Sequence, residues 1–169
     1  SFLSAEMAEV HRQGLLEQVD LLAINVDEAM ALTGLSQRTC VEAVVNAVVE
    51  QVQRLPRPPQ LSITAGNRGS WVWDGQTLRH QPAFRVPVAG TAGAGDAHLA
   101  GILVGLAAGL SLAEAQQLGT LVAALSVTSA DTIHFGVDRV SLAALAAEVG
   151  ASLSPSVRAL LEPSSEAYP

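Results

Sequence analysis

An α/β fold built on a mainly parallel sheet is predicted by three features of the sequence. Short apolar runs of strand length alternate with longer segments in which apolar residues recur at helical spacing. Glycine-rich turns follow predicted strands at residues 66–69 and 90–95. With 169 residues, 49% of them hydrophobic and 15% charged, the chain can bury one sizeable core. We therefore expect residues 1–162 to form a single domain and residues 163–169 a flexible tail.

The chain opens with a helix, a strand and a second helix. The first helix is expected to be capped by Ser4 and to run to about Val19. An apolar strand over residues 21–24 ends at Asn25, and the short helix after it closes at Gly34.

A longer helix and a hairpin come next. The helix is expected to open at Ser36, carries valines at helical spacing, and ends before the prolines at 56–59. A second buried strand covers residues 61–65. An Asp-Gly turn at 74–75 predicts a β-hairpin over residues 70–81.

The second half of the chain is mostly helical. Residues 86–89 are a further strand candidate, and Asp96 opens a long apolar helix that ends at Gly109. Ser111-x-x-Glu114 is a capping box, so another helix should run to about residue 128. The last two predicted helices cover residues 142–149 and 155–161.

The basic residues exclude several mechanisms, because all nine are arginine and the chain has no lysine. A G-x-x-x-x-G-K-[ST] phosphate loop, a protein-kinase active site and a Schiff-base enzyme all need a lysine. The formal net charge of -7 and the sequence pI of about 4.9 also argue against nucleic acid as a partner. A small anionic ligand would have to be held by backbone N–H groups, a metal ion or arginine.

The single cysteine and the longest apolar run bear on the compartment. Cys40 falls within a predicted amphipathic helix, so we expect a buried thiol in a reducing, cytoplasmic environment. The longest apolar run, residues 99–110, is too short for a membrane span. Because the chain starts at Ser1 rather than Met, we expect it to be part of a longer protein.

The stretch most informative about chemistry is the turn from Gly90 into the helix at Asp96. Successive small residues allow backbone N–H groups to point into one concavity, and the helix dipole favours an anion there. Asp96 should stay ionised at this helix start and could accept a proton from a substrate hydroxyl. The alternative is that Asp96 is only a first-turn helix residue beside a tight turn.

Three motifs, in order, resemble the ribokinase-like, or PfkB, family of carbohydrate and nucleoside kinases. Asn25-Val26-Asp27-Glu28 is similar to the family's N-x-x-E motif, and Thr64-Ala65-Gly66-Asn67-Arg68-Gly69 to its T-x-G-x-x-G nucleotide loop. Gly93-Ala94-Gly95-Asp96, preceded by Thr91 and followed by Ala100-Gly101, resembles its C-terminal signature. The resemblance implies a three-layer sheet flanked by helices, of which this chain would be the C-terminal portion without the lid.

The resemblance also implies roles for these residues. Gly93, Ala94 and Gly95 would form the anion hole for the transferred phosphoryl group, with Asp96 as catalytic base. Asn25 and Glu28 would lie near the ATP phosphates and their Mg²⁺, Glu28 mainly through water. Thr64, Gly66, Asn67, Arg68 and Gly69 would hold nucleotide, together with Thr91 and, at the adenine, Thr120.

Each of these assignments has a purely structural alternative. Asn25 with Glu28 is also a capping-box arrangement. Gly66 and Gly69 could simply supply positive φ in a turn between strands, and a helical threonine such as Thr120 usually packs or bonds its own helix. His98 is expected to be a packing residue, and Trp71 and Trp73 to pack the sheet rather than bind sugar.

The resemblance has two departures and one gap. Gly90 stands where relatives usually carry an acidic residue, and Ser129-Ala130-Asp131-Thr132 lacks the small Gly-Ala pattern of ribokinases. The resemblance therefore implies ATP and Mg²⁺ and leaves a K⁺ requirement open. No Gly-Gly acceptor motif is present. We expect transfer of the ATP γ-phosphoryl group to a hydroxymethyl group of a sugar or nucleoside, with dimerisation open to the full-length protein. The alternative is a non-catalytic nucleotide-binding module.

Overall fold

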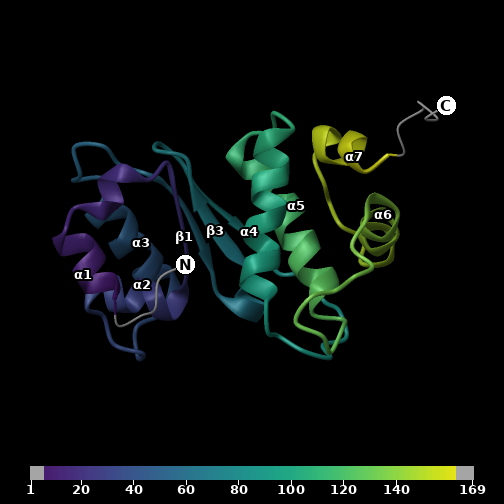
Figure 1. Cartoon of the computed structure of the whole chain (residues 1–169), viewed down its shortest axis with the longest axis horizontal. Helices are drawn as coiled ribbons and strands as arrows, with labels where there is room; N and C mark the ends of the chain where they lie inside the picture. The colour runs from purple at the N-terminus through teal and green to yellow at the C-terminus, as the bar shows by residue number, and fades with distance from the viewer. Residues whose placement is uncertain (1–5, 163–169) are drawn as a thin grey trace. The chain divides into compact units, whose positions relative to one another are not determined.

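The computed structural model describes residues 6–162 and divides the chain into two compact units, residues 1–82 and 83–169 (Figure 1). The predictions of a single domain over residues 1–162 and of its dimerisation stay predictions. The predicted tail at 163–169 and the Ser4 cap lie outside the described residues. Among residues 6–162 no helix is both long and apolar enough to span a bilayer.

The first unit is a four-stranded sheet with helices packed against it. Strand order is β1-β2-β3-β4. Its elements are α1 (Met7–Arg12), the 3₁₀ turn η1 (Leu15–Gln18), β1 (Leu21–Asn25), α2 (Val26–Thr33), α3 (Val41–Val52), β2 (Gln60–Thr64), the 3₁₀ turn η2 (Gly66–Arg68), β3 (Ser70–Trp73) and β4 (Leu78–Gln81).

Side-chain alternation along the strands builds the core of this unit. The register aligns Leu22, Leu61 and Trp73 in one row across β1, β2 and β3, with Ile24, Ile63 and Trp71 in the next. All six are buried in one cluster with the valines that α3 carries at helical spacing. Both tryptophans therefore pack the sheet, as expected. In Figure 1, α1, α2 and α3 lie together beside the strands.

The α/β class is confirmed, but the sheet of this unit is mixed rather than mainly parallel. Only β1 and β2 pair in parallel, whereas β2–β3 and β3–β4 are antiparallel. The reason is the length of the connections. Short turns join β2 to β3 and β3 to β4, and a parallel pair needs a crossover of a dozen or more residues.

Two helix predictions in this unit are wrong in extent. The first helix does not continue to Val19, because Gly14 adopts a left-handed φ of 69° after α1 and a 3₁₀ turn follows. The long helix begins at Val41 instead of Ser36, since the Thr39 N–H closes a turn onto the Ser36 carbonyl. Cys40 is consequently an exposed N-cap residue and not a buried thiol.

The second unit is helical. Its elements are α4 (Ala94–Ala107), α5 (Leu112–Ser126), α6 (Arg139–Glu148) and α7 (Pro155–Leu161). The capping box expected at Ser111 is present, and the Ser111 hydroxyl and N–H lower the pKa of Glu114 to about 2. The strand predicted over residues 86–89 does not form, since Pro87 has no N–H for a ladder and Ala89 donates to the Val127 carbonyl.

Small residues set the contact between α4 and α5, which lie side by side (Figure 1). A Cβ added at Gly101 would lie 2.6 Å from Cα of Gly119, and one added at Gly105 would lie 2.9 Å from Cα of Ala115. The backbones approach so closely that these positions leave no room for a side chain. Glycine is therefore required at these positions of α4 by the close contact with α5, although glycine has a low helix propensity.

Candidate functional site

In the first unit the predicted nucleotide residues gather at the carboxyl edge of the parallel strand pair. Asn25 ends β1 and Thr64 ends β2, and the two are register partners. Parallel strands lie about 4.8 Å apart, so the N-terminus of α2 and the turn after Thr64 are neighbours. Carboxyl ends of strands are where open α/β sheets bind ligands.

Asn25 and Glu28 form a capping box at the start of α2. The Asn25 side-chain Oδ1 accepts the Glu28 N–H at 2.9 Å, and Glu28 Oε2 accepts the Asn25 N–H at 2.9 Å. Glu28 is only 7% exposed. The capping interpretation is therefore correct as a description of the geometry. It leaves Glu28 Oε1 outside the cap, where that oxygen could face a hydrated cation.

The turn from Thr64 to Gly69 is closed by its own backbone bonds. Ala65 N–H donates to the Gly69 carbonyl, Arg68 N–H to Ala65, and Gly69 N–H to Gly66. Gly66 and Gly69 have φ of 54° and 88°, so both supply the positive φ that the turn requires and that glycine adopts readily. The N–H groups of Gly66 and Asn67 stand outside these bonds. An ordinary turn between strands therefore accounts for the presence of both glycines. The N–H groups of Gly66 and Asn67 nevertheless remain available as hydrogen-bond donors to a ligand.

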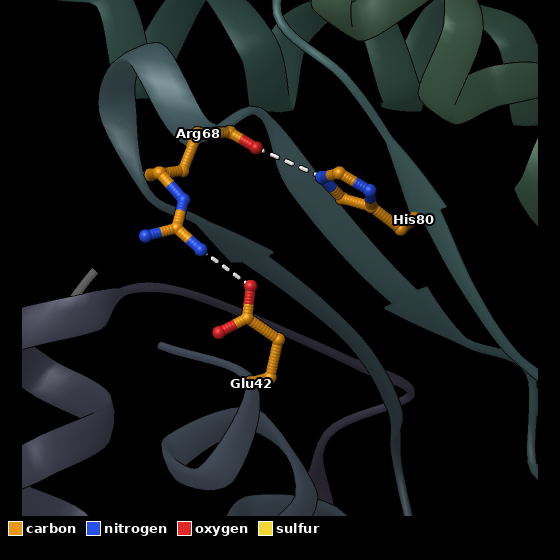
Figure 2. Close-up of polar contacts among 3 residues, drawn as sticks. All are labelled: Glu42, Arg68 and His80. Atoms are coloured by element: carbon orange, nitrogen blue, oxygen red, sulfur yellow. Dashed lines mark hydrogen bonds and ion pairs between the residues drawn. The ribbon is translucent and has the colours of Figure 1, made fainter. Parts of the chain in front are cut away.

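Arg68 is held at both its side chain and its main chain (Figure 2). Its Nη2 lies 2.5 Å from Oε1 of Glu42, in the first turn of α3, and its carbonyl lies 2.8 Å from Nε2 of His80 on β4. The backbone N–H of Glu42 and, after it, the Arg68 guanidinium lower the pKa of the Glu42 carboxyl. The cation expected to face ATP phosphates is thus paired with a carboxylate.

The second unit contains the glycine-rich turn and the start of α4. Gly93 is the N-cap with φ of 79°, and Ala94, Gly95 and Asp96 make the first helical turn, two residues earlier than the expected start at Asp96. A Cβ at Gly93 would lie 2.4 Å from the Thr132 carbonyl oxygen. First-turn N–H groups have no intrahelical acceptor, so this end of α4 is suited to an anion.

Asp96 is exposed, and no hydrogen bond to its carboxylate is found within residues 6–162. The carboxylate therefore lies at a helix start with its oxygens available to solvent. Thr91, also exposed, supplies the carbonyl that accepts the Ala94 N–H. These two residues and the glycine turn lie within one short stretch of the second unit.

The two segments that depart from the family resemblance pack against each other. Ala89 and Gly90 both donate their N–H to the Val127 carbonyl, at 2.8 and 3.3 Å. A Cβ at Gly90 would lie 3.2 Å from the Ser129 carbonyl oxygen. The absence of a side chain at position 90 therefore allows the chain after Val127 to lie close to the turn.

Thr120 and His98 both make the structural contacts that were weighed for them, and an adenine contact by Thr120 stays a prediction. Thr120 is buried on α5, and its hydroxyl donates to the Gln116 carbonyl one turn earlier at 2.8 Å. His98 is 3% exposed, and burial lowers its pKa to about 4, so it is neutral at pH 7.

Sequence reasoning missed Glu42 and His80. Glu42 had no signal, because it is one acidic residue in a helical first turn. His80 did have a signal in the sequence, because the register of the predicted hairpin places it directly opposite Trp71. In the structure the two rings stack with their centroids 4.2 Å apart. Among residues 6–162 there is no group of three or more His, Cys, Asp or Glu side chains that could hold a metal ion.

Comparison with known proteins identifies one family. The model of the pfkB family carbohydrate kinases matches residues 2–138. The uncharacterised sugar kinase YegV of Escherichia coli is 35% identical over 103 residues, which are 61% of this chain and 31% of that protein. The aligned region thus spans about a third of that relative's length.

The comparison with solved structures agrees with this family match. Arabidopsis thaliana ribokinase, complexed with ribose and ATP, superposes with a TM-score of 0.66 at 28% identity, covering 78% of this chain and 42% of that one. Adenosine kinase from Sinorhizobium meliloti gives a TM-score of 0.64 at 27% identity, covering 84% and 42%. The ribokinase-like fold expected from the motifs is confirmed.

Proposed function

Because the chain belongs to the pfkB family of carbohydrate kinases, we propose that it carries the nucleotide-binding elements and the catalytic base of an ATP-dependent sugar kinase. The acceptor is a hydroxymethyl group, on a sugar or on the ribose of a nucleoside. The sugar is favoured by the sugar kinase relative and the ribokinase structure, and the nucleoside by the adenosine kinase structure. The chain covers less than half of the length of each of these proteins, so the activity is proposed for the whole protein.

The observation that carries this proposal is the start of α4. Asp96 lies exposed at the third helical position, directly after the glycine turn, and the N–H groups of Gly95 and Asp96, which make no backbone bond, favour an anion there. In the reaction, the acceptor oxygen forms a bond to the γ-phosphorus while the bond from that phosphorus to the β–γ bridging oxygen breaks. The acceptor proton passes to the Asp96 carboxylate, and the electron pair of the broken bond leaves with ADP.

The first unit would bind the nucleotide. The N–H groups of Gly66 and Asn67, and the Thr64 side chain, support phosphate binding beside Asn25. Mg²⁺ fits the available donors, because Glu28 Oε1 lies outside the capping box and Mg²⁺ usually keeps several waters rather than entering an all-protein cage. When bound, Mg²⁺ would offset the negative charge of the phosphates.

The test is Asp96→Asn in the protein that contains this chain, with Asp138→Asn as the matched control. Asp138 caps α6, and asparagine caps equally well. Asp96→Asn should keep Mg-ATP affinity and lower the rate of phosphoryl transfer by about 10²- to 10⁴-fold. Unchanged turnover would overturn the role of Asp96. Binding of Mg-ATP by calorimetry without ADP production in the wild type would support the non-catalytic nucleotide-binding module instead.

A further inference from the structure

The turn Gly66–Arg68 is braced by two elements that are distant in sequence. His80 on β4 holds the Arg68 carbonyl at 2.8 Å, and Glu42 on α3 holds its guanidinium at 2.5 Å (Figure 2). Within the turn, only three backbone bonds fix the conformation. Glycines with positive φ stand at both of its ends, and glycine is the residue with the most conformational freedom to lose. Bonds from outside the turn therefore matter for keeping it in one conformation.

The His80 ring is itself fixed in place. It stacks on Trp71 with the ring centroids 4.2 Å apart and the planes 23° apart, and Trp71 is a buried residue of the core. Trp71 and His80 are also register partners across β3 and β4. A carbonyl only accepts hydrogen bonds, so Nε2 must carry the proton that it donates to Arg68. The pairing of β3 with β4 thus places the Nε2–H group of His80 at hydrogen-bond distance from the Arg68 carbonyl.

We propose that His80 is a positioning residue for nucleotide binding, acting through the Arg68 carbonyl, with Glu42 restraining the side chain of the same arginine. The proposal rests on the proposed function for its ligand, the ATP phosphates. His80 touches no phosphate in this scheme. It keeps the Thr64–Gly69 turn in the conformation that leaves the N–H groups of Gly66 and Asn67 available.

Two substitutions separate the hydrogen bond from the ring stack. His80→Gln keeps a side-chain N–H near the position of Nε2 and loses the ring, whereas His80→Phe keeps a ring on Trp71 and loses the donor. Arg79→Gln, on the same strand and exposed, is the control. Losing one neutral hydrogen bond should speed hydrogen exchange about fivefold at the amides that make the backbone bonds of the turn, those of Ala65, Arg68 and Gly69. His80→Phe should show this and weaken Mg-ATP binding by a similar factor, while His80→Gln and Arg79→Gln stay near the wild type.

The two readouts distinguish the failure of this inference from the failure of the proposed function. Unchanged exchange of the Ala65, Arg68 and Gly69 amides in His80→Phe overturns the brace, whatever the protein binds. Faster exchange with unchanged Mg-ATP affinity overturns the positioning role. A wild type that does not bind Mg-ATP in calorimetry overturns the proposed function and the ligand assigned to this turn, while exchange still decides whether His80 holds it. Tryptophan emission checks that each variant keeps the packing around Trp71.

Discussion

Replacing Gly101 with alanine should destabilise the contact between α4 and α5. The new Cβ would lie 2.6 Å from Cα of Gly119, 3.0 Å from its N, and 3.1 Å from Val122 Cγ2. The two nearest atoms are backbone atoms, so no side chain can rotate away to make room. One helix must shift against the other.

The expected magnitude is a difference between two terms. Alanine is favoured over glycine inside a helix by about 1 kcal/mol. Overpacking a close contact costs about 1–3 kcal/mol. Gly95 lies in the same helix, has no positive φ, and a Cβ there would meet nothing within 4 Å, so Gly95→Ala should show the helix gain alone. We expect Gly101→Ala to unfold about 2 kcal/mol more easily than Gly95→Ala.

The assay is urea denaturation followed by circular dichroism at 222 nm, with both variants and the wild type measured at the same pH. Gly95→Ala should raise the midpoint and Gly101→Ala should lower it. A Gly101→Ala variant as stable as Gly95→Ala would refute the conclusion that the glycines of α4 are required by close backbone approach.

Three further predictions concern the site and the buried histidine. Glu28→Gln should keep the cap on Asn25, because the amide oxygen can accept the same N–H, while raising the Mg²⁺ concentration needed for ATP binding about tenfold in a metal titration. Arg68→Gln should weaken Mg-ATP binding in calorimetry by less than about fivefold, because its charge is already paired with Glu42; a hundredfold loss would contradict this. The pKa of folded His98 is about 4, below its ordinary 6.5, so the unfolded chain binds more protons between these values. The free energy of unfolding is therefore highest above pH 6.5, where the ring is neutral in both states. It falls by about 3 kcal/mol in total as the pH falls toward 4. His98→Phe should flatten that slope in urea titrations from pH 7 to 4.5.

Local patterns predicted the elements that depend on near neighbours in sequence. The strand before Asn25, the hairpin at residues 70–81 and the capping box at Ser111 are all set by side chains within a few positions of one another, and all are confirmed. The capping box at Asn25 was also recognised, as the alternative to a ligand role. The geometry shows that box, and the ligand role of Glu28 stays a prediction.

Contacts between segments that are distant in the sequence could not be predicted from local sequence patterns. The exposure of Cys40 depends on a turn that delays the start of α3, and periodicity alone extends a helix too far. The partners of Arg68 come from α3 and β4, 26 and 12 positions away, and no local pattern links them. The family motifs predicted a set of site residues but could not show that Arg68, the one cation among them, is already paired with Glu42.

The turn at Gly93 has a consequence for how this protein can vary. Two independent demands require glycine there: a φ of 79°, and a gap that a Cβ would close to 2.4 Å from the oxygen of Thr132. That oxygen belongs to the main chain, which every amino acid carries. In genetic terms, a substitution at position 93 should therefore have no suppressor among side-chain changes at position 132, and position 93 is free to change only if the path of the backbone changes with it.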